Sequence, residues 1–341
     1  AVHMPSEVRL IPAIYVGTPG KGSAIKAIFE AAQHLNVKSV ALVDSDLRSI
    51  TPEWMKLLIT PTLNGTEFVS PLYNRRKYDG TITNFLCYPV TASLYGKKIR
   101  QPIGGDFGLS LKMVNTILNS PMWNYPDVHR FGIDIFETHT ALSTGFEIKQ
   151  ALLGVKNHDP KDPSSQLASM FRQVISTMFT CIEQYEEAWT KVEGTSEVES
   201  VGDGKYTAVP DPVEVDFQGT VNAFTNNFDK YVTVYKKVLS NELLSKFEQM
   251  KKEFKNADLP SETWAKTVYS FAAKFHHMPP TERALIVDAL RVLWIGRVAV
   301  FMKETWELDR DSAERKIIEE AQVFEKLKPY FTSLYFNATY R

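Results

Sequence analysis

The chain has 341 residues, of which 44% are hydrophobic and 23% charged, as in an ordinary globular protein with a sizeable core. Its formal net charge of -1 provides no overall field that would attract nucleic acid or an anionic membrane, so we expect neither as a partner. The longest apolar stretch, near residues 284–302, is interrupted by charged residues and is predicted to be a buried helix. Two cysteines, Cys87 and Cys181, suit free thiols in a cytoplasmic protein.

Strands and helices alternate through the first half of the chain. Residues 8–16 alternate as a strand, and a helix follows the Gly-Lys-Gly motif at 20–22. Further strands are predicted at 38–44, 67–73 and 147–155, and further helices from 52 onwards and at 82–95, 109–118 and 133–145. Such alternation is typical of an α/β sheet.

The second half is predicted to be helical. A long amphipathic helix at 166–192 is followed by a segment rich in Gly, Ser and Glu, which is typical of a linker. Helices are then predicted at 218–238, 240–255, 260–276, 280–305 and 309–333. We therefore expect a catalytic domain at 1–192, a linker at 193–213 and an all-helical C-terminal domain at 214–341.

The most informative segment is the apolar strand at 38–44, which ends in Asp44 and Asp46. A loop at the end of a strand can direct two such carboxylates at one divalent cation, because hard cations take oxygen ligands. Alone the pair is a weak signal, since most such pairs are solvated turn residues.

Other segments stand around this pair in a specific order. Lys21 lies between two glycines, so the backbone and the ammonium can approach a phosphate closely, although the full P-loop spacing is absent. A Gln-Pro-Ile-Gly-Gly-Asp loop follows at 101–106, then Gly-Ile-Asp at 132–134 and Lys-Asn-His at 156–158. Each has a plainer explanation on its own: a flexible loop, a Gly-Gly turn, a first-turn aspartate of a helix, and a loop histidine.

In this order and spacing the segments resemble the nucleotide-sugar glycosyltransferases of the GT-A fold, especially the mannosylglycerate, glucosylglycerate and glucosyl-3-phosphoglycerate synthases. The resemblance covers residues 7–185 well and continues weakly into the helical tail. It implies a GT-A-like mixed sheet flanked by helices, with an all-helical C-terminal region. Such a sheet normally has two βα units before the Gly-Lys-Gly motif, so we expect units missing before residue 1.

On the donor side, the resemblance implies Mg²⁺ or Mn²⁺ held by Asp46 and His158. An imidazole beside a carboxylate suits a borderline metal such as Mn²⁺. Lys21 would lie against the diphosphate and Asp44 would bind the ribose or the sugar. Lys21 and Asp46 are therefore assigned to catalysis. Ile11 replaces a glutamine that contacts the base in related enzymes, which leaves the nucleotide open.

The glycine loop and Asp134 would surround the transferred sugar. Ile103 and Gly104 would present backbone groups to the acceptor, and Gly105 to both acceptor and sugar. Asp106 stands where the family usually has glutamate, and would accept hydrogen bonds from the hexose. Asp134 is the third residue assigned to catalysis, because it would bind hydroxyl groups and orient the attacking oxygen.

Arg75 and Thr83 would hold the carboxylate of the acceptor, D-glycerate, since a guanidinium pairs with a carboxylate and a hydroxyl adds a donor. A solvated basic turn is the alternative. Enzymes that use 3-phosphoglycerate carry an additional arginine just before this threonine, where this chain has none, and this favours free glycerate. Arg76 and Lys77 keep 3-phosphoglycerate open as the acceptor.

The sequence thus predicts a retaining, metal-dependent hexosyltransferase that forms a homo-oligomer. It would move glucose or mannose from a UDP- or GDP-linked donor to the 2-hydroxyl of glycerate. No side chain is an obvious covalent nucleophile, so we expect front-face attack, with the metal and Lys21 stabilising the leaving diphosphate. A non-catalytic protein that binds sugar nucleotides is the rival of another class.

Overall fold

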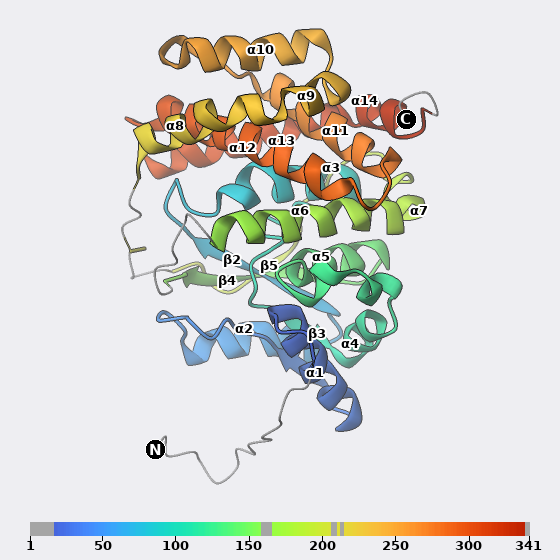
Figure 1. Cartoon of the computed structure of the whole chain (residues 1–341). Coiled ribbons are helices and arrows are strands. Elements are labelled where there is room, and N and C mark those ends of the chain that lie inside the picture. The colour runs from blue at the N-terminus through green and yellow to red at the C-terminus, as the bar shows by residue number, and fades with distance from the viewer. Residues whose placement is uncertain (1–16, 158–165, 206–209, 212–214, 338–341) are drawn as a thin grey trace.

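The computed structural model describes residues 17–157, 166–205, 210–211 and 215–337, so the strand predicted at 8–16 lies outside the described residues. Figure 1 shows a central sheet with α2 on one side and α5 and α6 on the other, and the helices of the C-terminal half stacked beyond α6. The predicted architecture is confirmed: a mixed sheet flanked by helices is followed by an all-helical C-terminal region.

Five strands form the sheet, in the spatial order β1-β3-β2-β4-β5. They are β1 (Ser39–Ala41), β2 (Phe68–Asn74), β3 (Gly108–Ser110), β4 (Ile148–Val155) and β5 (Ser200–Val201). β3 runs antiparallel to β1 and β2, whereas β2 pairs in parallel with β4, and β4 with β5. The segments that follow β1, β2 and β4, and the one that precedes β3, therefore meet at one edge of the sheet. Among the described residues, the motifs after residue 40 that were predicted to bind donor or acceptor lie in these segments or just beyond them. Asp134 is the exception.

Alternate side chains of β2 pack against different helices, because successive residues of a strand point to opposite faces. Phe68 packs with α1 (Lys21–His34), α4 (Leu111–Leu118) and α5 (Ile133–Ser143) in one apolar cluster. Val69 packs in a second cluster on the other face, with Trp54 and Leu58 of α2 (Pro52–Leu63). The sheet is thus buried on both faces, which fixes the register of its strands and, with it, the position of the loops at its edge.

The remaining helices share one large core. They are α3 (Tyr88–Tyr95), α6 (Gln166–Gln184), α7 (Glu186–Trp189), α8 (Phe217–Phe228), α9 (Val232–Val238), α10 (Asn241–Lys252), α11 (Ser261–His277), α12 (Arg283–Thr305), α13 (Arg310–Lys326) and α14 (Lys328–Tyr335). A π-helical turn, η1 (Thr83–Cys87), precedes α3, and short 3₁₀ turns lie at η2 (Pro121–Asn124), η3 (Pro126–His129), η4 (Asp229–Tyr231) and η5 (Phe254–Asn256). Among the described residues, no helix is both long and apolar enough to cross a membrane.

Several predicted boundaries differ from the structure. The helices predicted at 218–238 and 309–333 are each interrupted, by η4 and after Lys326. The helix predicted at 109–118 begins only at Leu111, because 108–110 form β3 and the Ser110 hydroxyl accepts a hydrogen bond from the Met113 N–H as an N-cap. The helix predicted at 166–192 is interrupted after Gln184. The segment predicted as a linker, 193–213, contributes β5, which pairs with β4. The division into two domains at these residues stays a prediction.

Candidate functional site

A buried group of ion pairs centres on Asp44, in the segment that follows β1. Lys21, the first residue of α1, places its Nζ 2.8 Å from Asp44 Oδ1. Lys156, directly after β4, places its Nζ 2.7 Å from Asp44 Oδ2 and 2.8 Å from Asp106 Oδ2. Two distant segments of the chain thus hold the Asp44 carboxylate. We call Lys21, Asp44 and Lys156, together with Asp134 described below, the lysine–aspartate cluster.

Asp106 lies beneath this cluster and is fully buried. Its Oδ1 accepts from the backbone N–H of Asp44 at 2.8 Å, and its Oδ2 accepts from Lys156 and from the hydroxyl of Tyr73. Because both carboxylate oxygens of Asp106 are buried and hydrogen-bonded, we expect Asp106 to hold Asp44 and Lys156 in position. This differs from the hexose contact that the sequence predicted for Asp106.

Asp134 joins the cluster from the first turn of α5, with its carboxylate 2.9 Å from Lys21 Nζ. One turn further along the same helix lies Glu137, whose two carboxylate oxygens are buried and have no hydrogen-bond partner in the described part of the chain. Burial raises the pKa of Asp134, and Lys21 offsets part of this effect. Burial raises the pKa of Glu137 well above its usual value, and the neighbouring Asp134 adds to it. Glu137 is therefore expected to be protonated, and Asp134 is easier to protonate than a solvated aspartate.

The charges of Lys21 and Asp44 reinforce each other. Burial by itself would lower the pKa of Lys21, but Asp134 and Asp44 outweigh it and raise that pKa above its ordinary value. Burial would likewise raise the pKa of Asp44, yet Lys21 and Lys156 hold it well below its ordinary value. Lys21 and Asp44 therefore remain charged at neutral pH.

Two glycines allow the loop before β3 to pass close to the cluster. Gly105 has φ +84°, and a Cβ there would lie 2.7 Å from Asp44 Oδ2 and 2.8 Å from Lys21 Nζ. A Cβ on Gly104 would lie 2.2 Å from Cγ of Pro71, and the Gly104 carbonyl accepts a hydrogen bond from Lys156 at 2.8 Å. Ile103, just before them, is partly buried against the large helical core. The absence of a side chain at Gly105 thus lets the loop backbone pack directly against the Lys21–Asp44 pair.

Replacing Gly105 by Ala is expected to lower the melting temperature more than the same change at Gly145. Both glycines have left-handed backbones, with φ +84° and +69°, so alanine is strained at either position. At Gly105 the methyl group would also displace the Lys21–Asp44 pair, whereas nothing lies within 4 Å of it at Gly145. Thermal unfolding of the two variants measures the difference, and equal shifts would contradict the close packing over the cluster.

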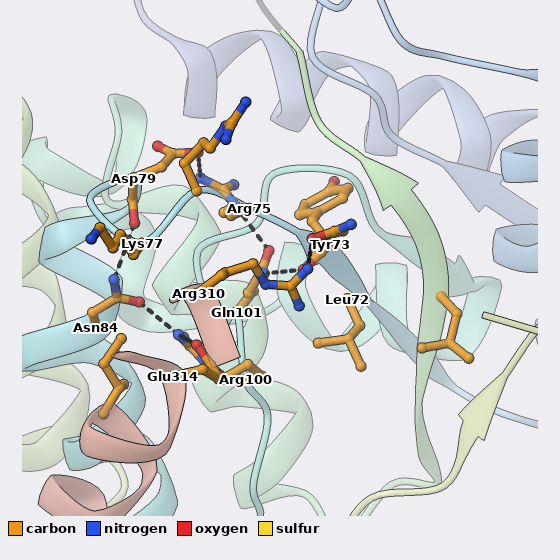
Figure 2. A pocket seen from close by; sticks show the side chains of 14 residues that line it. Leu72, Tyr73, Arg75, Lys77, Asp79, Asn84, Arg100, Gln101, Arg310 and Glu314 are labelled. Atoms are coloured by element: carbon orange, nitrogen blue, oxygen red, sulfur yellow. Dashed lines mark hydrogen bonds and ion pairs between the residues drawn. The ribbon is translucent and has the colours of Figure 1, made fainter. Parts of the chain in front are cut away.

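A basic pocket of about 250 Å³ lies on the other side of Tyr73, and Figure 2 shows its side chains. It is lined by Leu72, Tyr73, Asn74, Arg75, Arg76, Lys77, Asp79, Asn84, Arg100, Gln101, Leu152, Arg310, Glu314 and Ile317. Five of these residues are cationic (Arg75, Arg76, Lys77, Arg100, Arg310) and two are acidic (Asp79, Glu314). The surplus of three positive charges makes the pocket suited to a small anion.

Arg75 is held in this pocket by several groups at once. Its Nε donates to Gln101 Oε1 at 3.3 Å, its Nη1 lies 3.2 Å from Asp79 Oδ2, and its guanidinium lies 5.2 Å from the centre of the Tyr73 ring. A Cβ on Gly80 would lie 3.4 Å from Arg75 Nη1 and 3.8 Å from Thr83 Oγ1. Arg75 and Thr83 therefore flank the same glycine, as two residues that bind one acceptor group would.

Tyr73 connects the pocket to the lysine–aspartate cluster. Its ring is approached by Arg75 from the pocket and by Lys156 from the cluster, each at 5.2 Å from the ring centre, and its hydroxyl donates to Asp106. Gln101 connects Arg75 to the backbone of Tyr73, because it accepts from Arg75 and donates to the Tyr73 carbonyl at 3.3 Å. The sequence assigned no role to Tyr73 or Lys156, although Lys156 stands inside the Lys-Asn-His motif, and it included Gln101 only as part of the loop at 101–106.

The two predicted metal ligands are described unequally. Asp46 belongs to the described chain, whereas His158 lies outside it, so the predicted proximity of the two stays a prediction. The residue before His158 is anchored to the loop that follows Asp46: the Asn157 carbonyl accepts from the Arg48 N–H at 2.9 Å, and the Asn157 N–H donates to Ser49 Oγ at 2.9 Å. Within the described residues, no three His, Cys, Asp or Glu side chains are grouped to hold a metal ion.

Comparison with known proteins gave matches among solved structures. No family model matches the chain, and no curated protein matches it. Glucosyl-3-phosphoglycerate synthase from Mycobacterium tuberculosis, in complex with Mn²⁺, UDP-glucose and phosphoglyceric acid, is 25% identical over 50% of this chain and 57% of that chain, with a TM-score of 0.40. The same enzyme with Mg²⁺ and UDP is 25% identical over 49% of this chain and 56% of that chain, with a TM-score of 0.41.

The chain thus spans a little over half the length of the structures it matches. Both structures are of a glucosyl-3-phosphoglycerate synthase, which is one of the enzyme groups that the sequence motifs resemble.

Proposed function

We propose that the protein is a metal-dependent glycosyltransferase, which moves a hexosyl unit from a nucleotide diphosphate sugar to the hydroxyl of a small, phosphorylated hydroxy acid such as 3-phosphoglycerate. The carrying observation is the adjacency of two charged regions. Tyr73 lines the basic pocket and also contacts Lys156 of the lysine–aspartate cluster, so a donor and an anionic acceptor bound there would be neighbours.

On the donor side, Lys21 would receive the diphosphate, and the loop of Gly104 and Gly105 beside it would contact the sugar. Asp44, kept charged by two lysines, would accept hydrogen bonds from ribose or sugar hydroxyls. As a diphosphate leaves, negative charge develops on its oxygens, and a fixed ammonium such as Lys21 stabilises that charge without having to reorganise. Asp106 and Lys156 hold Asp44 in place from below.

A divalent cation, Mg²⁺ or Mn²⁺, fits this donor set, with Asp46 and His158 as its ligands. Mg²⁺ is commonly held by one or two carboxylates together with substrate phosphates, so a complete cage of protein ligands is not needed. When bound, the ion would neutralise part of the charge of the departing diphosphate.

The proposed transfer retains the configuration of the donor. The acceptor hydroxyl attacks the anomeric carbon from the side that the diphosphate leaves, and its proton passes to an oxygen of that diphosphate. Asp134 lies 2.9 Å from Lys21 and would orient the attacking hydroxyl. Its pKa, raised chiefly by burial, suits a hydrogen-bonding role better than that of a strongly ionised carboxylate.

The charge of the pocket supports 3-phosphoglycerate over free glycerate, the acceptor that the sequence favoured. Glycerate carries one negative charge, which would compensate only one of the three surplus positive charges of the pocket. A phosphate ester adds about two more negative charges near neutral pH. Arg75 and Thr83 are assigned to the carboxylate, and the phosphate would need a further cation of the same pocket.

The test is a matrix of UDP-glucose, GDP-glucose and GDP-mannose against 3-phosphoglycerate and glycerate, with Mg²⁺ or Mn²⁺ and the product identified by NMR. We expect an α-linked product at the 2-hydroxyl, formed faster with 3-phosphoglycerate. Tight binding of a sugar nucleotide with no transfer to either acceptor would favour the non-catalytic alternative.

Replacing Arg75 by Ala is expected to raise the KM for the acceptor by at least about tenfold, since a charge-assisted hydrogen bond contributes roughly 1.5–3 kcal/mol. The KM for the donor should change little, because Arg75 lines the pocket and not the lysine–aspartate cluster. Thr83→Val should act in the same direction with a smaller effect. If Arg75→Ala weakened donor binding instead, the acceptor pocket would be wrongly placed.

A further inference from the structure

The basic pocket has a wall that none of the sequence motifs includes. Arg310, Glu314 and Ile317 of α13 line it, opposite the loop that carries Arg75. Figure 2 shows Arg310 and Glu314 among the labelled side chains, next to Gln101 and Arg100. The C-terminal helical region therefore contributes directly to the pocket proposed to bind the acceptor.

Two of the five cations in the pocket are already engaged by short contacts. Lys77 donates to three backbone carbonyls at and beyond the end of α12, those of Thr305, Trp306 and Leu308, at 2.8–2.9 Å. Arg100 is paired with both carboxylate oxygens of Glu314, at 2.6 and 2.9 Å. Lys77 thus caps a helix and Arg100 is neutralised, so neither is well placed to take up the charge of a ligand.

Arg310 is engaged differently. Its guanidinium donates to the neutral side-chain oxygen of Asn74, and its ion pair with Asp311 on its own helix is longer, at 3.6 Å. The side chain is 49% exposed, so it can turn toward a ligand in the pocket. Arg75, by contrast, is fixed by Gln101, Asp79 and Tyr73. Arg75 is thus preorganised, whereas Arg310 retains a charge that a second anionic group could use. Arg76, the fifth cation, donates its Nε to the Pro210 carbonyl at 3.1 Å.

We propose that Arg310 binds the phosphate of the acceptor and makes α13 the element that selects phosphorylated over free hydroxy acids. Guanidinium groups bind phosphate through parallel N–H donors, which gives both strength and geometric selectivity. Arg75 then holds the carboxylate at the other end of the same molecule. The assignment rests on the proposed function only for the identity of the acceptor.

Equilibrium binding separates the two ideas, because it needs neither donor nor turnover. 3-Phosphoglycerate and D-glycerate are titrated calorimetrically into the wild-type chain and into Arg310→Gln, Arg310→Lys and Arg315→Gln. Arg315 is the matched control, since it is exposed on the same helix and bonds Ser312 Oγ at 2.7 Å. Thermal unfolding of each variant checks that the fold is kept.

The wild type should bind 3-phosphoglycerate at least about tenfold more tightly than glycerate, as expected for one charge-assisted hydrogen bond. Arg310→Gln should remove this preference and leave glycerate binding unchanged, Arg310→Lys should retain part of it, and Arg315→Gln should behave as the wild type. Equal loss for both compounds, a preference that survives Arg310→Gln, or no binding of either compound to the wild type would overturn the role of Arg310. Selective binding without glycosyl transfer from any nucleotide sugar would instead refute the proposed function alone.

Discussion

Replacing Asp46 by Asn is expected to reduce hexosyl transfer by roughly two to three orders of magnitude while leaving the fold intact. A bound metal ion contributes several kcal/mol of charge stabilisation in the transition state, and each 1.4 kcal/mol corresponds to about tenfold in rate. Asp46 lies in the segment beyond β1 and outside the apolar clusters, so its loss should not disturb the core. Initial rates at saturating Mn²⁺, together with circular dichroism, measure both effects.

The matched control for this change is Asp229→Asn in η4, where the side chain is 69% exposed, pairs with Lys251, and loses the same charge. It should leave the rate unaltered. A variant Asp46→Asn that turned over at the wild-type rate would show that Asp46 does not hold the metal.

Replacing Lys156 by Met is expected to destabilise the protein by about 3–5 kcal/mol, the usual cost of removing one partner of a buried ion pair. The Lys156 side chain is 6% exposed and Asp106 is not exposed at all. The Lys156 ammonium contacts both carboxylates, so without it the negative charges of Asp44 and Asp106 would repel each other. The hydrogen bond from the Asp44 N–H to Asp106 keeps these two residues close together. Donor binding should be lost as well, because Asp44 would no longer be held.

Chemical denaturation measures the first effect and calorimetric titration of the donor the second. Lys191→Met provides the control, since Lys191 forms a surface pair with Glu187 within one helical turn and its side chain is 70% exposed. Unfolding of Lys156→Met at the wild-type denaturant midpoint would contradict the electrostatic account of the cluster.

Much of the fold could be predicted because its local signals are strong. The apolar run at 67–73 became β2, and Pro52 after Thr51 began α2. The strand order, with β3 inserted antiparallel between β1 and β2, required pairings across distant segments that periodicity does not report. The strand in the predicted linker, β5, is only two residues long and carries no such pattern.

The residues that meet in the lysine–aspartate cluster could be singled out from the sequence, because Lys21, Asp44 and Gly105 each stand in a short motif. Their role in donor binding stays a prediction. Asp106 was assigned to the sugar since its residue type permits it. Its burial depends on Tyr73 and Lys156, which approach from β2 and from the end of β4. A sequence pattern gives the type of a residue, but it does not show which neighbouring groups form hydrogen bonds with its oxygens.

The basic pocket was harder to predict because the charges that shape it come from distant segments. The sequence favoured free glycerate on the residues just before Thr83, while the structure brings Arg310 into the same pocket from α13. Lys77, counted as a charge of the acceptor loop, instead caps the end of α12. Only packing of the C-terminal helices against the sheet edge decides which cations face the pocket.

The central claim, that the lysine–aspartate cluster and the basic pocket together transfer a sugar, is tested most directly by acceptor-dependent release of nucleoside diphosphate. The donor that turns over in the matrix is incubated with Mn²⁺, with and without 3-phosphoglycerate, using the wild type and Lys21→Met. We predict release by the wild type in proportion to acceptor consumed, and almost none from Lys21→Met or after chelation of the metal. Release that is unaffected by acceptor, by chelation and by Lys21→Met would contradict the account.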